Sequence, residues 1–85
     1  MNKLAILYRG AELCVELDDT EARLLINGLV RQRSPVSKTV LLSSTVQTDY
    51  EWHEFIEGIV TRHSRGVKMV LVANKVEIAE KEFTH

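Results

Sequence analysis

The sequence predicts an α/β protein: a two-layer sandwich in which two helices cover one face of a mixed five-stranded sheet. Three observations lead to this class. A segment recurs after 30 residues, two apolar stripes have helical spacing, and short apolar or alternating runs lie at both ends of the chain. The predicted order of elements is β-β-α-β-α-β-β, and residues 1–85 are expected to form a single domain.

The recurring segment is Asp19–Leu42, which aligns with Asp49–Val72. Unrelated segments of this length would share roughly one or two residues. Here nine aligned positions are identical: Asp19/Asp49, Glu21/Glu51, Ile26/Ile56, Gly28/Gly58, Val30/Val60, Ser34/Ser64, Lys38/Lys68, Val40/Val70 and Leu41/Leu71. A helix–strand unit that occurs twice is therefore predicted.

Both ends of the chain are expected to form β-hairpins. Lys3–Leu7 is apolar, Arg9-Gly10 is a turn signal, and Glu12–Leu17 alternates between apolar and polar residues. Such a pattern indicates two strands with one buried face. At the other end, the alternating run Val76–Phe83 is expected as a charged edge strand that pairs with Val67–Val72.

Two helices are predicted between these hairpins, over Asp18–Arg33 and Thr48–Ser64. Each begins with a capping-box pattern and continues with one apolar face. The two apolar stripes are Ala22, Leu25, Ile26, Leu29 and Val30, then Trp52, Phe55, Ile56, Ile59 and Val60. Gly28 and Gly58 fall at the same place in both helices, where close packing is expected and a shallow dip for a partner is the alternative.

Lys38–Ser43 and Val67–Val72 are continuous apolar runs, which are typical of buried strands. Helical crossovers join parallel strands, so three parallel central strands flanked by antiparallel ones are expected. The order of strands in the sheet stays open. A competing arrangement has two protomers that pair through an edge strand or an open sheet face.

The predicted architecture gathers basic residues on one rim, because both helices would end at the same edge of the sheet. Dipole compensation at helix ends is a sufficient explanation for such a pattern. The functional interpretation is a partner-binding rim, with Tyr50 as an exposed contact residue. The basic residues chosen for this rim are Arg31, Arg33, Lys38, Arg62, Arg65 and Lys68.

Other kinds of site receive little support from the sequence. The loop Ser43–Thr48 precedes a predicted helix N-terminus that could hold an anion, but Asp49 would repel phosphate there. Cys14 lies on the opposite face of its strand from Leu13 and Val15, and an inert thiol is expected. The histidines match no metal spacing, and no catalytic constellation is present, so neither an enzyme, a metal nor a cofactor is predicted.

The expected function is a small non-enzymatic regulator, inhibitor, adaptor or accessory subunit, of a kind that phages and mobile elements encode. It would dock onto another protein with an acidic surface. Binding of nucleic acid through the same basic rim is one alternative, and an oligomer that binds a small ligand or a nucleotide is another. A homodimer through an edge strand is expected because the chain is short.

The net charge is −1, there is one cysteine, and no apolar run approaches the length of a membrane span. These features favour a cytoplasmic protein that does not contact membranes.

Overall fold

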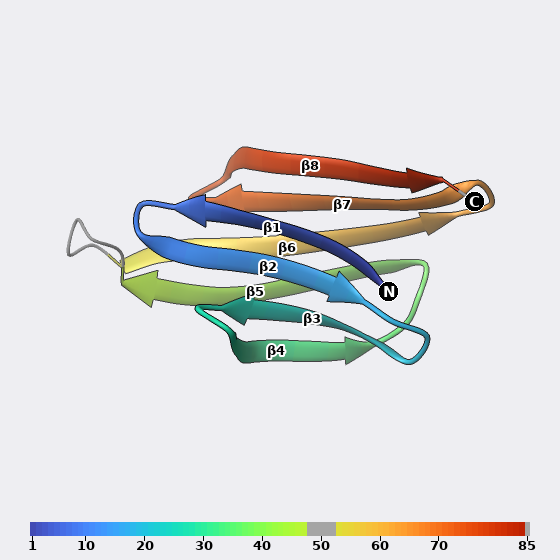
Figure 1. Ribbon diagram of the computed structural model, residues 1–85, viewed down its shortest axis with the longest axis horizontal. Helices are drawn as coiled ribbons and strands as arrows, with labels where there is room; N and C mark the ends of the chain where they lie inside the picture. The colour runs from blue at the N-terminus through green and yellow to red at the C-terminus, as the bar shows by residue number, and fades with distance from the viewer. Residues whose placement is uncertain (48–52, 85) are drawn as a thin grey trace.

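The computed structural model describes residues 1–47 and 53–84, and every regular element in them is a β-strand (Figure 1). Eight antiparallel strands form two four-stranded sheets that stack face to face. The first sheet contains β1 (Asn2–Tyr8), β2 (Ala11–Leu17), β3 (Glu21–Ile26) and β4 (Leu29–Pro35), in that order. The second contains β5 (Thr39–Gln47), β6 (His53–His63), β7 (Gly66–Ala73) and β8 (Val76–Thr84), also in chain order.

The prediction of a first helix over Asp18–Arg33 is wrong, because this segment forms a turn and the hairpin β3–β4. Asn27 and Gly28 adopt φ angles of 52° and 80°, the left-handed pair that a two-residue hairpin turn requires. In β3, Ala22, Leu24 and Ile26 are buried while the residues between them are half-buried. This period of two belongs to a strand.

The prediction of a second helix over Thr48–Ser64 is also wrong for the part that the structure describes. Residues 53–63 form β6, and Thr48–Trp52, which include Tyr50 and Trp52, lie outside the described residues. The inward positions of β6 alternate with outward ones, but Phe55 and Ile59 on the outer face are apolar too. The apolar residues on both faces together imitate a helical stripe.

Residues 1–47 and 53–84 contain no helix and no crossover connection, so the predicted α/β class and mixed five-stranded sheet are wrong as well. All neighbouring strands are antiparallel. The predicted strands themselves are confirmed as parts of β1, β2, β5, β7 and β8, and so are the two terminal hairpins. The run predicted over Lys38–Ser43 begins at Thr39 and continues to Gln47.

The 30-residue repeat does not correspond to a repeated structure, since Gly28 lies in a turn and Gly58 lies inside β6. The hairpins that do match are β3–β4 and β7–β8, which are offset by 47 residues. Asn27 and Asn74 hold equivalent turn positions with φ angles of 52° and 51°. Each asparagine Oδ1 accepts a 2.9 Å bond from the backbone N–H of a neighbouring strand, at Glu12 and Phe55 respectively.

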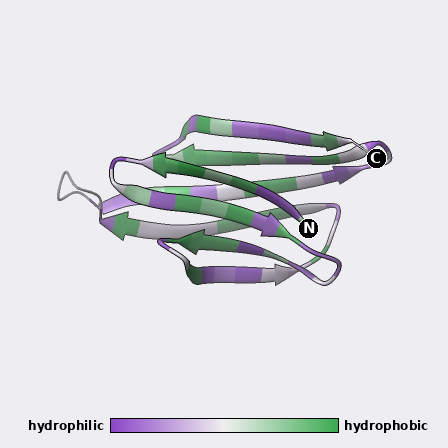
Figure 2. Ribbon diagram, viewed as in Figure 1, coloured by the Kyte–Doolittle hydropathy of each residue, from purple (hydrophilic) through white to green (hydrophobic). Residues whose placement is uncertain are grey.

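The core lies between the two sheets, and both sheets supply it with aliphatic side chains. Figure 2 shows the corresponding apolar colouring along the central strands of both sheets. The largest fully buried hydrophobic residues are Leu13, Val15, Leu24, Ile26, Leu42, Ile56, Val60, Met69 and Leu71. Within residues 1–47 and 53–84 there is no helix long and apolar enough to span a membrane.

One side of the sandwich is closed by side chains that link the outer strands β4 and β5. The backbone N–H of Ser43 donates to Gln32 Oε1 at 2.5 Å, and Arg31 Nη2 donates to Thr45 O at 3.0 Å. Arg31 is the extra residue of a β-bulge, because Leu24 pairs with Gln32 and Leu25 with Val30. The other two outer strands, β1 and β8, lie on the opposite side.

Candidate docking surface

Three of the six predicted rim residues lie together at one end of the sandwich. Lys38 lies between β4 and β5, Arg62 is near the end of β6, and Arg65 is in the turn to β7. The backbone N–H of Arg62 donates to Lys38 O at 2.7 Å, which fixes the two segments side by side. Figure 1 shows the β4–β5 connection and the β6–β7 turn at this end. We call Lys38, Arg62, His63 and Arg65 the basic end.

The other three rim residues have partners within the chain, and Lys68 lies on β7 opposite Thr61, the neighbour of Arg62. Arg31 bonds to β5, Arg33 Nη1 lies 3.7 Å from a Glu21 carboxylate oxygen, and Lys68 Nζ lies 3.4 Å from Glu80 Oε2. The described residues contain no parallel strands that could gather all six on one rim. Of the six predicted rim residues, Lys38, Arg62 and Arg65 lie at this end without an ion pair among the described residues, and Tyr50 lies outside the described residues.

The basic end surrounds an open recess of about 320 Å³, lined by Lys38, Arg62, His63 and Gly66. In the part of the chain that the structure describes, no acidic side chain lies within ion-pair distance of Lys38, Arg62 or Arg65. His63 Nδ1 accepts a 3.3 Å bond from the backbone N–H of Arg65, so a neutral His63 ring carries its proton on Nε2. The recess is thus bordered by hydrogen-bond donors and positive charge.

A second cavity of about 300 Å³ opens beside the recess, at the mouth between the two sheets. Arg62 lines both cavities, while the β2–β3 turn contributes Asp18 and Asp19 to the second one. This end of the molecule is consequently positive on the side of the second sheet and negative on the side of the first. The two signs of charge give the surface a direction in which a partner would dock.

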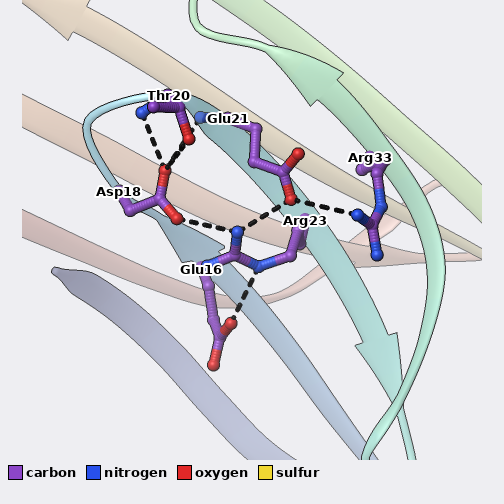
Figure 3. Close-up of polar contacts among 6 residues, drawn as sticks. All are labelled: Glu16, Asp18, Thr20, Glu21, Arg23 and Arg33. Carbon is purple, nitrogen blue, oxygen red and sulfur yellow. Dashed lines mark hydrogen bonds and ion pairs between the residues drawn. The ribbon is translucent and has the colours of Figure 1, made fainter.

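The acidic side is held in place by Arg23, which lies on β3 (Figure 3). Its guanidinium contacts three carboxylates: Asp18 at 2.8 Å, Glu21 at 2.8 Å and Glu16 at 3.2 Å. The Arg23 side chain is only 15% exposed, so its contacts are better ordered than those between fully exposed side chains. The cluster supports the β2–β3 turn and keeps an excess of negative charge, because one guanidinium faces three carboxylates.

Asp18 was expected to begin a helix, and instead it caps the β2–β3 turn. Its Oδ1 accepts the backbone N–H groups of Thr20 at 2.8 Å and Glu21 at 2.9 Å. These two bonds, first that from Glu21 and then that from Thr20, lower the pKa of the Asp18 carboxyl well below its ordinary value, and Arg23 adds to the effect. The charged form of Asp18 therefore stabilises the fold.

The pH dependence of stability tests this assignment. Because the pKa of Asp18 is lower in the folded state, its contribution is complete above about pH 4 and declines as the pH falls further. Asp18→Asn retains an oxygen acceptor but cannot take up a proton. We therefore expect its free energy of unfolding, measured with urea from pH 7 downward, to fall less steeply at acid pH (the acid limb) than that of the parent protein. An acid limb as steep as that of the parent protein would contradict the role given to Asp18.

At the opposite end of the sandwich, β6 places a carboxylate inside the molecule. Glu54 is 2% exposed, and its Oε1 accepts three bonds: from the Tyr8 hydroxyl at 2.9 Å, Arg9 Nη1 at 2.7 Å and Asn74 Nδ2 at 2.9 Å. Tyr8 and Arg9 belong to the first sheet and its turn, so the group links the two sheets. The sequence reasoning missed this glutamate. Glu54 lies two residues before Ile56 and six before Val60, so a strand places all three side chains on the same buried face. This spacing was the available signal.

The remaining candidates do not form sites. Cys14 lies on the outer face of β2, as predicted, and is buried, which raises the pKa of its thiol, with a further increase from Glu16. Ser43, Ser44 and Thr45 belong to β5 rather than to a loop, and the predicted helix start at Thr48 lies outside the described residues. Among the described residues, no group of three His, Cys, Asp or Glu side chains could hold a metal ion.

Comparisons with known proteins give no match, whether the chain is compared with family models, with curated proteins or with solved structures.

Proposed function

We propose that this chain is a small non-enzymatic binding protein that docks its basic end onto an acidic surface of another protein. The observation that supports this function is a recess lined by Lys38 and Arg62, with Arg65 in the adjacent turn and no ion pair to any of the three in the described part of the chain. Exposed charges of one sign accelerate encounter with a complementary surface and select against like-charged partners. A regulator, inhibitor or accessory subunit would use such a surface.

Several features favour an acidic protein over a nucleic acid. The basic end carries three full positive charges, and Asp18 and Asp19 lie across the neighbouring cavity, where they would repel a phosphate backbone. Among the described residues, no Phe, Tyr or Trp lines either cavity, whereas binding of single strands depends on aromatic stacking. The net charge of −1 gives no general attraction for polyanions. Nucleic-acid binding through the same residues is the second candidate.

A matched pair of triple variants tests the proposal. The first replaces Lys38, Arg62 and Arg65 by Gln, and the control replaces Lys3, Lys75 and Lys81 by Gln, so both remove three positive charges. With poly-L-glutamate as the probe at low salt, we expect the first variant to bind about tenfold more weakly than the parent. The control should bind within about twofold of the parent. Thermal unfolding of all three proteins verifies that they are folded.

The same three proteins, immobilised and exposed to nuclease-treated lysate, extend the test to natural partners. A protein that the parent and the control retain, and that the first variant loses, would support the proposal. Equal retention by all three would overturn it. Tight binding to a DNA duplex with a steep dependence on salt would instead assign the basic end to nucleic acid.

The proposal includes a cytoplasmic location, for which the single cysteine gives the support, since one thiol cannot form an internal disulfide.

A further inference from the structure

The cavity of about 300 Å³ at the mouth between the two sheets combines apolar walls with charges of both signs. We call it the mouth cavity. Its walls include Leu17 from β2, Val36 from the β4–β5 connection and Val67 from β7. Leu17 and Val67 are 6% and 3% exposed, so these walls continue the hydrophobic core. Its charged lining comes from different sheets, with Asp19 from the β2–β3 turn and Arg62 from β6.

Arg62 reaches the mouth cavity because of its position in the alternation of β6. Ile56 and Val60 point into the core, and Arg62 follows Val60 by two residues, so the strand places it on the same face beyond the end of the core. It pairs with Val67 of β7. Its side chain therefore borders both the mouth cavity and the recess of the basic end. A partner carboxylate that binds Arg62 is thus held beside the mouth cavity.

The β4–β5 connection holds the two charged sides of this end in a fixed relation. On one side, the backbone N–H of Val36 donates to Thr20 O in the β2–β3 turn at 3.2 Å. On the other side, the backbone N–H of Arg62 donates to Lys38 O at 2.7 Å. Figure 1 shows the β2–β3 turn, the β4–β5 connection and the β6–β7 turn at this same end. A surface fixed in this way loses little conformational freedom when a partner binds.

On the acidic side, Asp18 and Asp19 differ in what they offer a partner. The Oδ1 atom of Asp18 accepts bonds from the backbone of Thr20 and Glu21. Its Oδ2 atom accepts a bond from Arg23 (Figure 3). Asp19 is exposed and forms no ion pair with any residue that the structure describes. The carboxylate of Asp19 is therefore the group that a cation at the mouth cavity would meet.

We propose that the mouth cavity binds a lysine or arginine side chain of the partner protein. This inference rests on the proposed function and specifies the partner: its acidic surface carries one basic residue beside the carboxylates that meet the basic end. The aliphatic stem of the basic side chain packs against Leu17, Val36 and Val67. Its charge pairs with Asp19, and a neighbouring carboxylate of the partner binds Arg62.

Other side chains match the mouth cavity less well. A purely aliphatic side chain would displace water from Asp19 without offering it a hydrogen bond, which costs free energy. An acidic side chain would meet the like charges of Asp18 and Asp19. A lysine or arginine side chain provides both an apolar stem for the walls and a cation for the carboxylate.

Peptides that differ at a single position test this inference. Short acetylated and amidated peptides carry glutamates on both sides of a central Arg, Gln or Leu, and NMR shifts of the backbone amides of the protein give their dissociation constants. Attraction by the basic end alone would make the Arg peptide the weaker ligand than the Gln peptide, because it is less negative. We expect the Arg peptide instead to bind about threefold more tightly than either of the others. It should shift the amides of Leu17, Val36 and Val67.

Two single variants locate the origin of this preference. Asp19→Asn removes the carboxylate assigned to the cation of the partner, so it should abolish the preference for the Arg peptide without weakening binding of the Gln peptide. The matched control is Glu77→Gln, which removes the same charge from an exposed position beside the β7–β8 turn, at the opposite end of the sandwich. The control should keep the preference of the parent. Thermal unfolding verifies that both variants are folded.

The outcomes separate this inference from the function on which it rests. If the parent bound the Gln peptide as tightly as the Arg peptide, the inference would be overturned while docking through the basic end stayed supported. Tightest binding of the Leu peptide would assign the cavity to an apolar side chain and reject the inference. A preference for Arg that survives Asp19→Asn would reject it as well. If none of the peptides bound, both the proposed function and the inference would fail.

Discussion

Replacement of Glu54 by Ala is expected to lower the free energy of unfolding by about 2–3 kcal/mol. The change removes the carboxylate oxygen that accepts hydrogen bonds from the Tyr8 hydroxyl, Arg9 and Asn74. Tyr8 and Asn74 would keep polar groups in a partly buried place without this acceptor, and a buried donor that loses its partner costs about 1–3 kcal/mol. The loss also releases the contact between the β1–β2 turn and β6.

Glu57 provides the matched control, because it is an acid on the same strand. Its ion pair among the described residues is with Lys75 at 3.6 Å, where the Lys75 side chain is 77% exposed and the Glu57 side chain 15% exposed. Because water screens the exposed ammonium, such a pair contributes roughly 0–1 kcal/mol, so Glu57→Ala should cost less than Glu54→Ala. Glu54→Gln retains one acceptor oxygen without the charge, and an intermediate loss is expected.

Urea unfolding at neutral pH, followed by tryptophan fluorescence or circular dichroism, measures these differences. Equal losses for Glu54→Ala and Glu57→Ala would show that the buried carboxylate does not hold the sheets together. A stabilised Glu54→Ala would mean that desolvation of the carboxylate outweighs its three hydrogen bonds.

The parts of the fold that the sequence revealed are those with a short and unambiguous period. In β2 the alternation of Leu13, Val15 and Leu17 with polar residues specifies a strand, and Arg9-Gly10 specifies its turn. The error arose where two periods fit equally well. In residues 21–26, Leu25 continues the helical stripe, whereas Leu24 continues the alternation of a strand.

The decisive local signal in that segment was Asn27-Gly28, a dipeptide that specifies a tight hairpin turn when apolar runs flank it. The apparent repeat outweighed it in the sequence reasoning. The repeat favoured one interpretation for both Gly28 and Gly58, although the two glycines have different roles in the structure.

Part of the docking surface was predictable because Lys38, Arg62 and Arg65 lie near chain reversals, and reversals collect at the ends of a sandwich. The association of Glu54 with Tyr8 and Arg9 was not predictable, since these residues are 46 and 45 positions apart. Only the stacking of the two sheets brings them together, and no local pattern encodes which residues meet across a core.

Gly58→Val is expected to destabilise the protein by about 3 kcal/mol, and Gly58→Ala by about 1–3 kcal/mol. Gly58 lies inside β6 against the first sheet, and a β-carbon there would lie 2.7 Å from Val15 Cγ2. Val15 is fully buried and branched at its own β-carbon, so it cannot rotate away at little cost. The sheets would have to separate at this point.

The sign of the effect of Gly58→Ala distinguishes the β-sandwich from the helical interpretation. In a helix, Gly→Ala stabilises by about 1 kcal/mol, and the same gain would be expected at Gly28. In the sandwich, Gly28 has open space around it but a φ of 80°, so Gly28→Ala is strained, whereas Gly28→Asn should be nearly neutral. Thermal unfolding of these variants measures both signs.

A double-mutant cycle locates the cause of the Gly58 effect. Val15→Ala destabilises by itself, because it leaves a cavity, but it also removes the atom that a new β-carbon would meet. Gly58→Ala should therefore cost at least about 1 kcal/mol less in the Val15→Ala background than in the parent. If the effects of Val15→Ala and Gly58→Ala were additive, the cost of Gly58→Ala would not arise from this contact. A stabilising Gly58→Ala would contradict close packing of the two sheets at β6.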